Sequence, residues 1–293
     1  MFFDKNNIQI IEKYNNKFPK QLYDLENCPE RLYVIGNEKL LNKFSIAVIG
    51  ARNCKNESRN YAEKISYGLA KQDIVIVSGM AKGIDAVAHE SCLKAKGKTI
   101  AVLGSGFNNI YPKENIKLFF KILDEDGLVV SEYAPEELPI NYHFLMRNRI
   151  VAALSKGVVL IEAKENSGSI TTAKHALKLK RNLFVLPGSV EDVGFTGSNK
   201  LLTSGAKCVL NSEDVLREYK KFSKRTRTRE TIENVLIPNE YLSIYEILSN
   251  KPKSINQIAI ELQITIPEIT AKLTFMELEG YVKQLNGKCF IRA

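Results

Sequence analysis

The sequence predicts an α/β protein whose main domain is a doubly wound, mostly parallel β-sheet, followed by a small helical domain. Two observations carry this prediction. Over residues 41–212, short apolar runs alternate with amphipathic stretches, the pattern of strands and helices in a parallel sheet. Beyond a basic segment at residues 213–236, the pattern changes over residues 237–293 to capped helices and a hairpin. A chain of 293 residues is long enough for two such units.

The composition favours a polyanionic partner without establishing one, because 42 lysines and arginines outnumber 33 aspartates and glutamates. No apolar run approaches the roughly 20 residues that span a bilayer, and the first residues lack the features of a signal peptide. We therefore expect a cytoplasmic protein without membrane contact. The 5 cysteines show no Cys-x-x-Cys spacing, which predicts buried free thiols rather than a metal site or disulfides.

Residues 1–40 are too short and too interrupted to form a domain of their own. An amphipathic start at residues 8–14 is followed by Phe18-Pro19 and Cys28-Pro29, and then by an apolar run from Leu32 to Gly36. We expect this N-terminal extension to pack on the unit that follows.

The first strand of the predicted sheet lies at residues 45–50, and Arg52 follows it. The continuous apolar run predicts a strand buried on both faces, and Gly50 permits the turn after it. Open α/β sheets bind ligands at the carboxyl ends of their strands, so Arg52 is placed where an anion would lie. From this stretch alone, a salt bridge to a neighbouring carboxylate is an equal alternative.

The later elements alternate regularly. Strands are expected at residues 74–77, 99–103, 128–130, 158–161, 183–186 and near 208–210. Helices are expected at residues 59–71, 85–96, 115–123, 147–154 and 170–179. Strict alternation of this kind predicts parallel strands with helices on both faces of the sheet.

The loops after the strands carry the candidate anion-binding residues. They are Arg52, Ser78, Gly79, Lys82, Lys113, Phe144, Arg147, Asn148, Arg149, Ser167, Gly168, Ser169 and Thr171. Glycines and hydroxyls at a helix N-terminus can hold an anion, and the five cations of this set are expected to share one sheet edge without a compensating run of acids. Taken singly, each residue also has a structural explanation, as a turn former, a helix cap or a core side chain.

Common nucleotide and hydrolase motifs fail in this chain. Gly104-x-Gly106 continues with Asn109 where a dinucleotide fingerprint requires a third glycine. Gly97-Lys98-Thr99 precedes a strand instead of following one, and Cys92 stands in place of the first glycine of a Walker motif. No Gly-x-Ser-x-Gly nucleophile elbow occurs. We therefore expect no bound cofactor.

A catalytic site is not indicated either. Asp85, His89 and Glu162 could form an acid/base set, but nothing in their spacing requires one.

The segment at residues 213–236 contains a basic run. Six cations fall within ten positions that hold no acid: Lys220, Lys221, Lys224, Arg225, Arg227 and Arg229. We favour a solvated linker over a nucleic-acid-binding arm for this segment.

Residues 237–293 predict three helices and a hairpin, which is the winged-helix arrangement. Ser254-x-x-Gln257 and Thr265-x-x-Glu268 are capping boxes that open the second and third helices. Gly280 ends the third helix, and Asn286-Gly287 provides the tight turn of the hairpin.

The predicted third helix would be the DNA reader in the usual docking of this motif. It carries Glu268, Glu277 and Glu279 against a lone Lys272, and this charge repels phosphate. A protein partner is therefore at least as good an interpretation of the domain as DNA.

Together these motifs resemble those of the DNA-processing protein DprA (Smf) family. The resemblance covers roughly residues 18–210, and its motifs are Phe18-Pro19, Gly50-Ala51-Arg52, Ser78-Gly79-Met80-Ala81-x-Gly83-Ile84-Asp85, Ala88-His89, Ile110-Tyr111-Pro112, Ser131-Glu132-Tyr133, Phe144-x-x-Arg147-Asn148-Arg149, Glu162-Ala163, Ser167-Gly168-Ser169, Thr171-Thr172-Ala173 and Pro187-Gly188. The C-terminal domain also resembles the winged helix that many members carry. Met80 and Leu145 depart from the usual family pattern of leucine and proline.

The resemblance implies an extended Rossmann-like domain that binds single-stranded DNA, forms a homodimer and helps to load the RecA recombinase during natural transformation. It assigns the DNA pocket to Arg52, Lys82, Phe144, Arg147 and Arg149. Cations would neutralise phosphates while the aromatic ring stacks a base, which gives affinity with little sequence preference.

Three functional hypotheses follow. The first is a non-enzymatic recombination mediator that protects incoming single-stranded DNA and loads RecA. The rival is a nucleotide phosphoribohydrolase on a related Rossmann-like fold, against which stands the absence of a glutamate after residues 167–172, since that glutamate is the general acid/base of the reaction. The third is an interaction scaffold that does not retain single strands.

Overall fold

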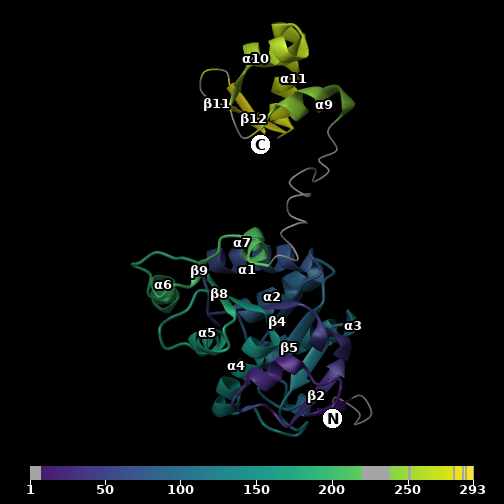
Figure 1. Cartoon of the computed structure of the whole chain (residues 1–293), viewed down its shortest axis with the longest axis vertical. Helices are drawn as coiled ribbons and strands as arrows, with labels where there is room; N and C mark the ends of the chain where they lie inside the picture. The colour runs from purple at the N-terminus through teal and green to yellow at the C-terminus, as the bar shows by residue number, and fades with distance from the viewer. Residues whose placement is uncertain are drawn as a thin grey trace. The chain divides into compact units, whose positions relative to one another are not determined.

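The computed structural model describes residues 8–219, 238–249, 252–279, 281–285, 287 and 289–292. The chain forms two compact units, residues 1–223 and 224–293 (Figure 1), and each is described by itself. The basic run from Lys220 to Arg229 lies outside the described residues, as do Gly280 and Asn286.

The larger unit is built on a nine-stranded sheet in the order β1-β2-β6-β5-β4-β3-β7-β8-β9. Its strands are β1 (Gln9–Glu12), β2 (Arg31–Gly36), β3 (Ser45–Gly50), β4 (Val75–Ser78), β5 (Thr99–Leu103), β6 (Leu128–Ser131), β7 (Gly157–Ile161), β8 (Asn182–Val185) and β9 (Lys207–Cys208). From β6 to β9 every neighbouring pair is parallel. The predicted mostly parallel α/β sheet is therefore confirmed.

The N-terminal extension supplies the antiparallel edge of this sheet. β2 pairs antiparallel with β6, and β1 pairs antiparallel with β2 at the border. The residues between and after them form the 3₁₀ helices η2 (Lys20–Asp24) and η3 (Glu38–Asn42). Leu22 of η2 is fully buried, so this extension is part of the core of the larger unit.

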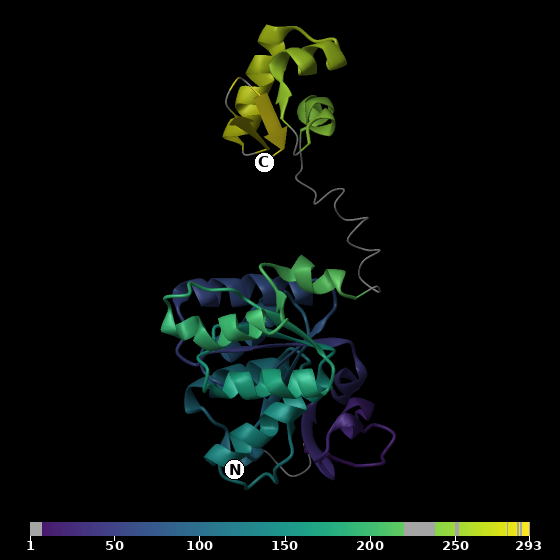
Figure 2. The same cartoon turned by 60° about the vertical axis from the view of Figure 1, so that its left-hand side comes forward.

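Helices cover both faces of the sheet. They are α1 (Asn56–Ala70), α2 (Ile84–Lys94), α3 (Ile116–Asp124), α4 (Asn141–Leu154), α5 (Gly168–Lys178), α6 (Thr196–Thr203) and α7 (Ser212–Arg217). Short 3₁₀ helices occur at η4 (Phe107–Asn109), η5 (Lys113–Asn115) and η6 (Val193–Phe195). The clusters of buried side chains place α1, α2 and α3 on one face and α4 and α5 on the other (Figure 2).

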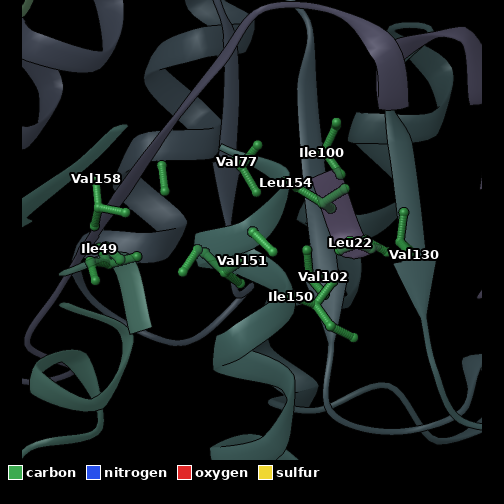
Figure 3. Close-up of a cluster of buried hydrophobic side chains, with 14 of the residues drawn as sticks. Leu22, Ile49, Val77, Ile100, Val102, Val130, Ile150, Val151, Leu154 and Val158 are labelled. Carbon is green, nitrogen blue, oxygen red and sulfur yellow. The ribbon is translucent and has the colours of Figure 1, made fainter. Parts of the chain in front are cut away.

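The core on the α4 face is made by alternate residues of the central strands. Ile49 of β3, Val77 of β4 and Val102 of β5 meet Ile150 and Val151 of α4 in one buried cluster (Figure 3). Neighbouring strand residues such as Val48 point to the other face and pack under α1 and α2. Burial of both sheet faces explains why the strands read as continuous apolar runs.

The chain reverses its winding direction at β3. It runs outward from β3 through β4, β5 and β6, and then returns to add β7 on the other side of β3. The crevice at the carboxyl ends of β3 and β7 is therefore a topological switch point, the place where open α/β sheets bind ligands. Arg52 follows β3 at this crevice, and Glu162 follows β7.

Two helix limits differ from the sequence prediction in a way that matters for function. α4 begins at Asn141, six residues before the predicted start at Arg147. Its N-cap residue, Ile140, makes no side-chain capping bond, so the sequence carries no cap signal there. α5 begins at Gly168, so Ser169 and Thr171 lie inside the helix instead of capping it.

The smaller unit has the predicted winged-helix elements. They are α9 (Asn239–Ile247), β10 (Lys253–Ser254), α10 (Ile255–Leu262), α11 (Ile266–Leu278), β11 (Val282–Leu285) and β12 (Cys289–Arg292). β11 and β12 form the antiparallel hairpin, with the short β10 on the other side of β12. Its own core gathers side chains from all three helices and the hairpin.

The two predicted capping boxes have different outcomes. The box of Ser254 and Gln257 is confirmed, with both reciprocal hydrogen bonds present. The box of Thr265 and Glu268 is wrong, because the Thr265 side chain makes no capping bond. Glu268 instead pairs with Lys272 one turn along, at 2.9 Å.

None of the helices in the described part of the chain has the length and the apolar character of a membrane span.

Candidate functional site

A cavity of about 630 Å³ opens at the switch point of the sheet. Four segments form most of its lining: the loop after β3, the loop after β4, the first turns of α4, and the stretch from β7 into α5. Gly194 of η6 also borders it. A small hollow of about 40 Å³ shares residues with the cavity and extends the lining to Lys82, Tyr111 and Pro112. The residues common to both are Arg52, Gly79, Ala81, Phe144 and Arg147.

Arg52 presents an exposed guanidinium to both hollows. Its Cζ atom lies 5.8 Å from the centre of the Phe144 ring, which is a cation–π distance. Within the described parts of the chain, no hydrogen bond or ion pair holds the Arg52 side chain. The salt-bridge alternative raised by the sequence therefore has no support, and the guanidinium keeps its donors for a ligand.

Phe144 is the aromatic wall of the site. It is half-buried on the first turn of α4, and its ring centre lies 5.4 Å from that of Tyr111 at an angle of 47°. Gly104 makes room for the ring, because a Cβ at that position would lie 2.6 Å from a ring carbon of Phe144. The ring is thus fixed on one side while it borders the cavity on the other.

Arg147 lies on the same face of α4 as Phe144, because residues three apart on a helix are neighbours. It is 4% exposed, and its Nη1 atom donates hydrogen bonds to the backbone carbonyls of Gly79 and Val102. Burial lowers the pKa of Arg147 to about 10, and Asp85 opposes that shift. Gly79 is required here, since a Cβ would lie 2.6 Å from the Arg147 guanidinium carbon.

Asp85 is the buried counter-charge of Arg147. Its Oδ2 atom accepts hydrogen bonds from the backbone N–H groups of Gly79 at 3.1 Å and Ala81 at 3.4 Å. Burial raises the pKa of Asp85, while Arg147 and the two backbone N–H groups oppose the rise. Arg147 therefore fixes the loop after β4 from within, and its guanidinium is less free to bind a ligand than that of Arg52.

The N-cap and the first turn of α5 supply three of the predicted residues. Ser167, Gly168 and Ser169 line the cavity, and the Ser169 hydroxyl donates to the carbonyl of Gly50 at 2.7 Å. Asn148 also lines the cavity, and its Nδ2 atom donates to the carbonyl of Gly168 at 3.1 Å. These two bonds connect α5 to β3 and to α4 across the crevice.

Among the predicted residues that are not cations, two lie outside the lining of the cavity. Ser78 is fully buried, and its hydroxyl donates to the carbonyl of Val48 at 2.7 Å. Thr171 is half-buried, and its neighbour Thr172 borders the cavity instead.

Three of the five cations predicted at this edge have individual acidic partners, although no run of acids lies there. Lys82 pairs with Glu114 at 2.5 Å on the surface. Arg149 forms two hydrogen bonds of 2.6 Å with Glu132 and is 6% exposed. Arg147 is balanced by Asp85, as described above.

The displacement of Arg149 follows from the helix. Residues two apart on a helix point ~200° apart, so Arg149 faces away from Arg147 and away from the cavity. Lys113 is exposed in η5 and lines neither hollow. Of the five predicted cations, only Arg52 borders the cavity without an acidic partner among the described residues.

The structure adds lining residues that the sequence argument did not select, among them Asn53, Tyr111, Leu145, Glu162 and Lys164. Glu162 and Tyr111 lie in motifs quoted above, and their position after a strand was the available signal. The possible set of Asp85, His89 and Glu162 does not assemble. Asp85 and Glu162 line the cavity, but His89 does not.

His89 is instead a core residue. It is fully buried, with its Nδ1 atom 2.7 Å from the hydroxyl of Thr99. Burial, and secondarily Arg147, lower the pKa of His89 to about 3. Among the described side chains, no group of three or more His, Cys, Asp or Glu residues could hold a metal ion.

The fold and the site together define a class of protein. It is a Rossmann-like domain that presents a guanidinium and an aromatic ring at a switch-point cavity, joined in one chain to a winged-helix domain. The family model of the DNA recombination-mediator protein A matches residues 9–220, and that of the DprA winged helix domain matches residues 238–288. The chain belongs to the DprA (Smf) family.

Relatives and solved structures agree with this assignment. The chain is 43% identical to the DNA processing protein DprA of Streptococcus pneumoniae over 202 residues, covering 69% of this chain and 71% of the relative. It is 32% identical to Protein Smf of Escherichia coli over 292 residues, covering 98% and 78%.

The solved structure of the Streptococcus pneumoniae protein aligns with a TM-score of 0.69 at 40% identity, covering 73% of this chain and 75% of the other. DNA processing protein A of Helicobacter pylori aligns with a TM-score of 0.66 at 35% identity, covering 73% of this chain and 96% of the other. That structure describes a single-stranded DNA binding mode of the Helicobacter pylori protein.

Proposed function

We propose that this protein binds single-stranded DNA in the switch-point cavity and acts as a recombination mediator without catalysis of its own. The observation that carries the proposal is the free guanidinium of Arg52 beside the ring of Phe144. A cation next to an aromatic face suits a phosphate followed by a stacked base, which is how proteins hold single strands without strong sequence preference. The single-stranded DNA binding of the Helicobacter pylori relative supports the same conclusion.

The proposed cellular role is the family's role. The protein would protect incoming single-stranded DNA in the cytoplasm, form a homodimer and help to load RecA onto the strand during natural transformation. Support for this part comes from membership of the recombination-mediator family. It is tested by measuring RecA filament formation on single strands coated with single-strand-binding protein, with and without this protein.

The test of the cavity is the variant Arg52→Ala. Loss of one charge-assisted contact should weaken binding by about 1.5–3 kcal/mol, and the slope of log affinity against log salt should fall by about 1. Lys121→Ala is the matched control, because Lys121 is an exposed cation on α3 and does not line the cavity. Fluorescence anisotropy of a labelled oligo(dT) at several salt concentrations measures both quantities.

Three outcomes separate the hypotheses. Unchanged affinity and salt slope in Arg52→Ala would refute the assignment of the cavity. Failure of the unmodified protein to retain oligo(dT) at low salt would favour the interaction scaffold. Release of free base from nucleoside monophosphates would favour the phosphoribohydrolase, although the structure shows no carboxylate in the described first turn of α5.

A further inference from the structure

The cavity contains an acidic side chain that phosphate binding does not use. Asp85 and Glu162 are the two carboxylates among its described lining residues. Asp85 is occupied by two backbone N–H groups and by the neighbouring Arg147. Glu162 is different, because only one of its oxygens has a hydrogen-bond partner among the described residues.

Glu162 follows β7 directly and is 4% exposed. Its Oε2 atom accepts a hydrogen bond of 2.9 Å from the backbone N–H of Lys55, the residue that precedes α1. Its Oε1 atom accepts no hydrogen bond from the residues that the structure describes. Gly194, another lining residue, leaves space beside that oxygen, since a Cβ there would lie 3.0 Å from Oε1.

No ion pair with a described cation neutralises this carboxylate. The ammonium group of Lys55 pairs instead with Asp192, at 2.6 Å. Lys164 lines the cavity but is exposed and forms no ion pair within the described chain. The backbone of Glu162 has φ 51°, in the left-handed region, where a non-glycine residue is uncommon and is often found at a functional site. The fold therefore holds an accepting oxygen at the border of the cavity.

The position of Glu162 relative to Arg52 follows from the register of the sheet. Gly50 of β3 pairs with Ile161 of β7, so Arg52 stands two residues beyond this pair and Glu162 one residue beyond it. A nucleotide in the cavity therefore meets a cation after β3 and a carboxylate oxygen after the neighbouring β7, and neither group has a hydrogen-bond or ion-pair partner from another side chain in the described part of the chain. Because a carboxylate repels phosphate, the group that approaches Glu162 must be a hydrogen-bond donor.

We propose that Glu162 reads the edge of one DNA base and selects bases that carry a ring N–H, which are thymine and guanine. The inference rests on the proposed single-stranded DNA binding. Thymine N3–H and guanine N1–H donate to a carboxylate oxygen. Cytosine N3 and adenine N1 present a lone pair at the same place, which the carboxylate repels, so these two bases could donate to Oε1 only through the exocyclic amino group at the end of that edge. Glu162 is therefore assigned as a specificity-determining residue in an otherwise sequence-tolerant site.

The test compares hexanucleotides of thymidine and of deoxycytidine, binding to the full chain at low salt by competition anisotropy. The thymidine hexamer should bind about tenfold more tightly, as expected for one hydrogen bond to a charged group. A thymidine hexamer methylated at N3 lacks the donor and should lose this advantage on the unmodified protein. The methylated strand keeps the thymine ring, apart from the N3 proton, so it controls for differences in stacking.

The variant Glu162→Gln sharpens the test. The backbone N–H of Lys55 requires an oxygen acceptor, so the amide oxygen should keep that bond and turn the NH₂ group toward the cavity. A donor at this place suits cytosine N3 and opposes thymine N3–H, so the preference should fall to about one or reverse. Glu165→Gln is the matched control, because Glu165 is an exposed acid of the same loop, pairs with Lys200 and does not line the cavity.

Each outcome decides one proposal. If the unmodified protein binds none of the hexamers, the proposed function fails. If it binds thymidine and deoxycytidine hexamers equally, or if Glu162→Gln leaves their ratio unchanged, the single-stranded DNA site stands and the base-reading role is refuted. If Glu162→Gln does not fold, as judged by circular dichroism, the methylated hexamer on the unmodified protein decides alone.

Discussion

The buried pair of Arg147 and Asp85 allows a prediction whose size follows from the structure. In Arg147→Met the two carbonyls of Gly79 and Val102 lose their donor, and the buried Asp85 loses its counter-charge. Removing one partner of a buried charge pair costs about 3–5 kcal/mol. For a unit of this size, 1 kcal/mol lowers Tm by about 2–4 °C, so the expected fall is about 6–20 °C.

The pH dependence of this loss has a definite sign. Burial raises the pKa of Asp85 in the folded protein, and Arg147 opposes that rise. Without Arg147 the pKa of Asp85 rises further, so the folded variant holds its proton to a higher pH than the unfolded chain. The variant therefore loses stability as pH rises from the unfolded value of about 3.9 through the raised folded value. The difference from the unmodified protein should be smaller at pH 5 than at pH 8.

Differential scanning calorimetry of the full chain at both pH values measures the effect. The double variant Arg147→Met with Asp85→Asn removes the stranded charge and should recover part of the lost stability, mainly at pH 8. Lys121→Met removes an exposed cation of α3 and is the control for charge alone. A loss below about 1 kcal/mol, which is the size expected of a surface ion pair, would refute the assignment of Arg147 as a structural cation. So would a loss that is equal at the two pH values.

Two further predictions concern the aromatic wall and the smaller unit. Phe144→Leu keeps an apolar side chain but removes the stacking face, so the affinity for oligo(dT) should fall by about 1–3 kcal/mol while the salt slope stays unchanged. Fluorescence anisotropy measures both quantities, and a shallower salt slope would contradict the stacking role. Ser254→Ala removes the capping box of α10 and should cost about 1 kcal/mol in the opening free energy of its amides, measured by hydrogen exchange. Thr265→Ala is its control, because that side chain makes no capping bond, and an equal loss there would contradict the explanation.

The order and type of the main-sheet elements could be predicted from the sequence because strands buried on both faces leave continuous apolar runs. The antiparallel edge could not, because the apolar run of β2 is followed by a short 3₁₀ helix and not by the amphipathic helix that follows most of the predicted strands. The start of α4 could not be predicted from the sequence either. Its N-cap is Ile140, which cannot accept a hydrogen bond from the first turn through its side chain.

This early start places Phe144 on the same helix as the two arginines. On one continuous helix, Phe144 and Arg147 share a face, whereas Arg149 points to the other side and pairs with Glu132. The acids that neutralise the predicted cations are distant in sequence, with Glu114 standing 32 positions after Lys82 and Glu132 standing 17 before Arg149. The sequence shows which cations follow a strand, but it does not identify acidic partners that are so distant along the chain.

The charge at the cavity has a consequence for how the site must bind. A protein that neutralises Z phosphates of a single strand shows a salt slope of about −0.7Z. Among the predicted cations, Arg52 lines this cavity and has no acidic partner in the described chain. Lys164 adds one exposed ammonium group. The number of phosphates that the cavity neutralises is therefore small. In this proposal, affinity must come largely from the contacts that salt does not screen, which are the stacking face of Phe144 and the hydrogen bond accepted by Glu162.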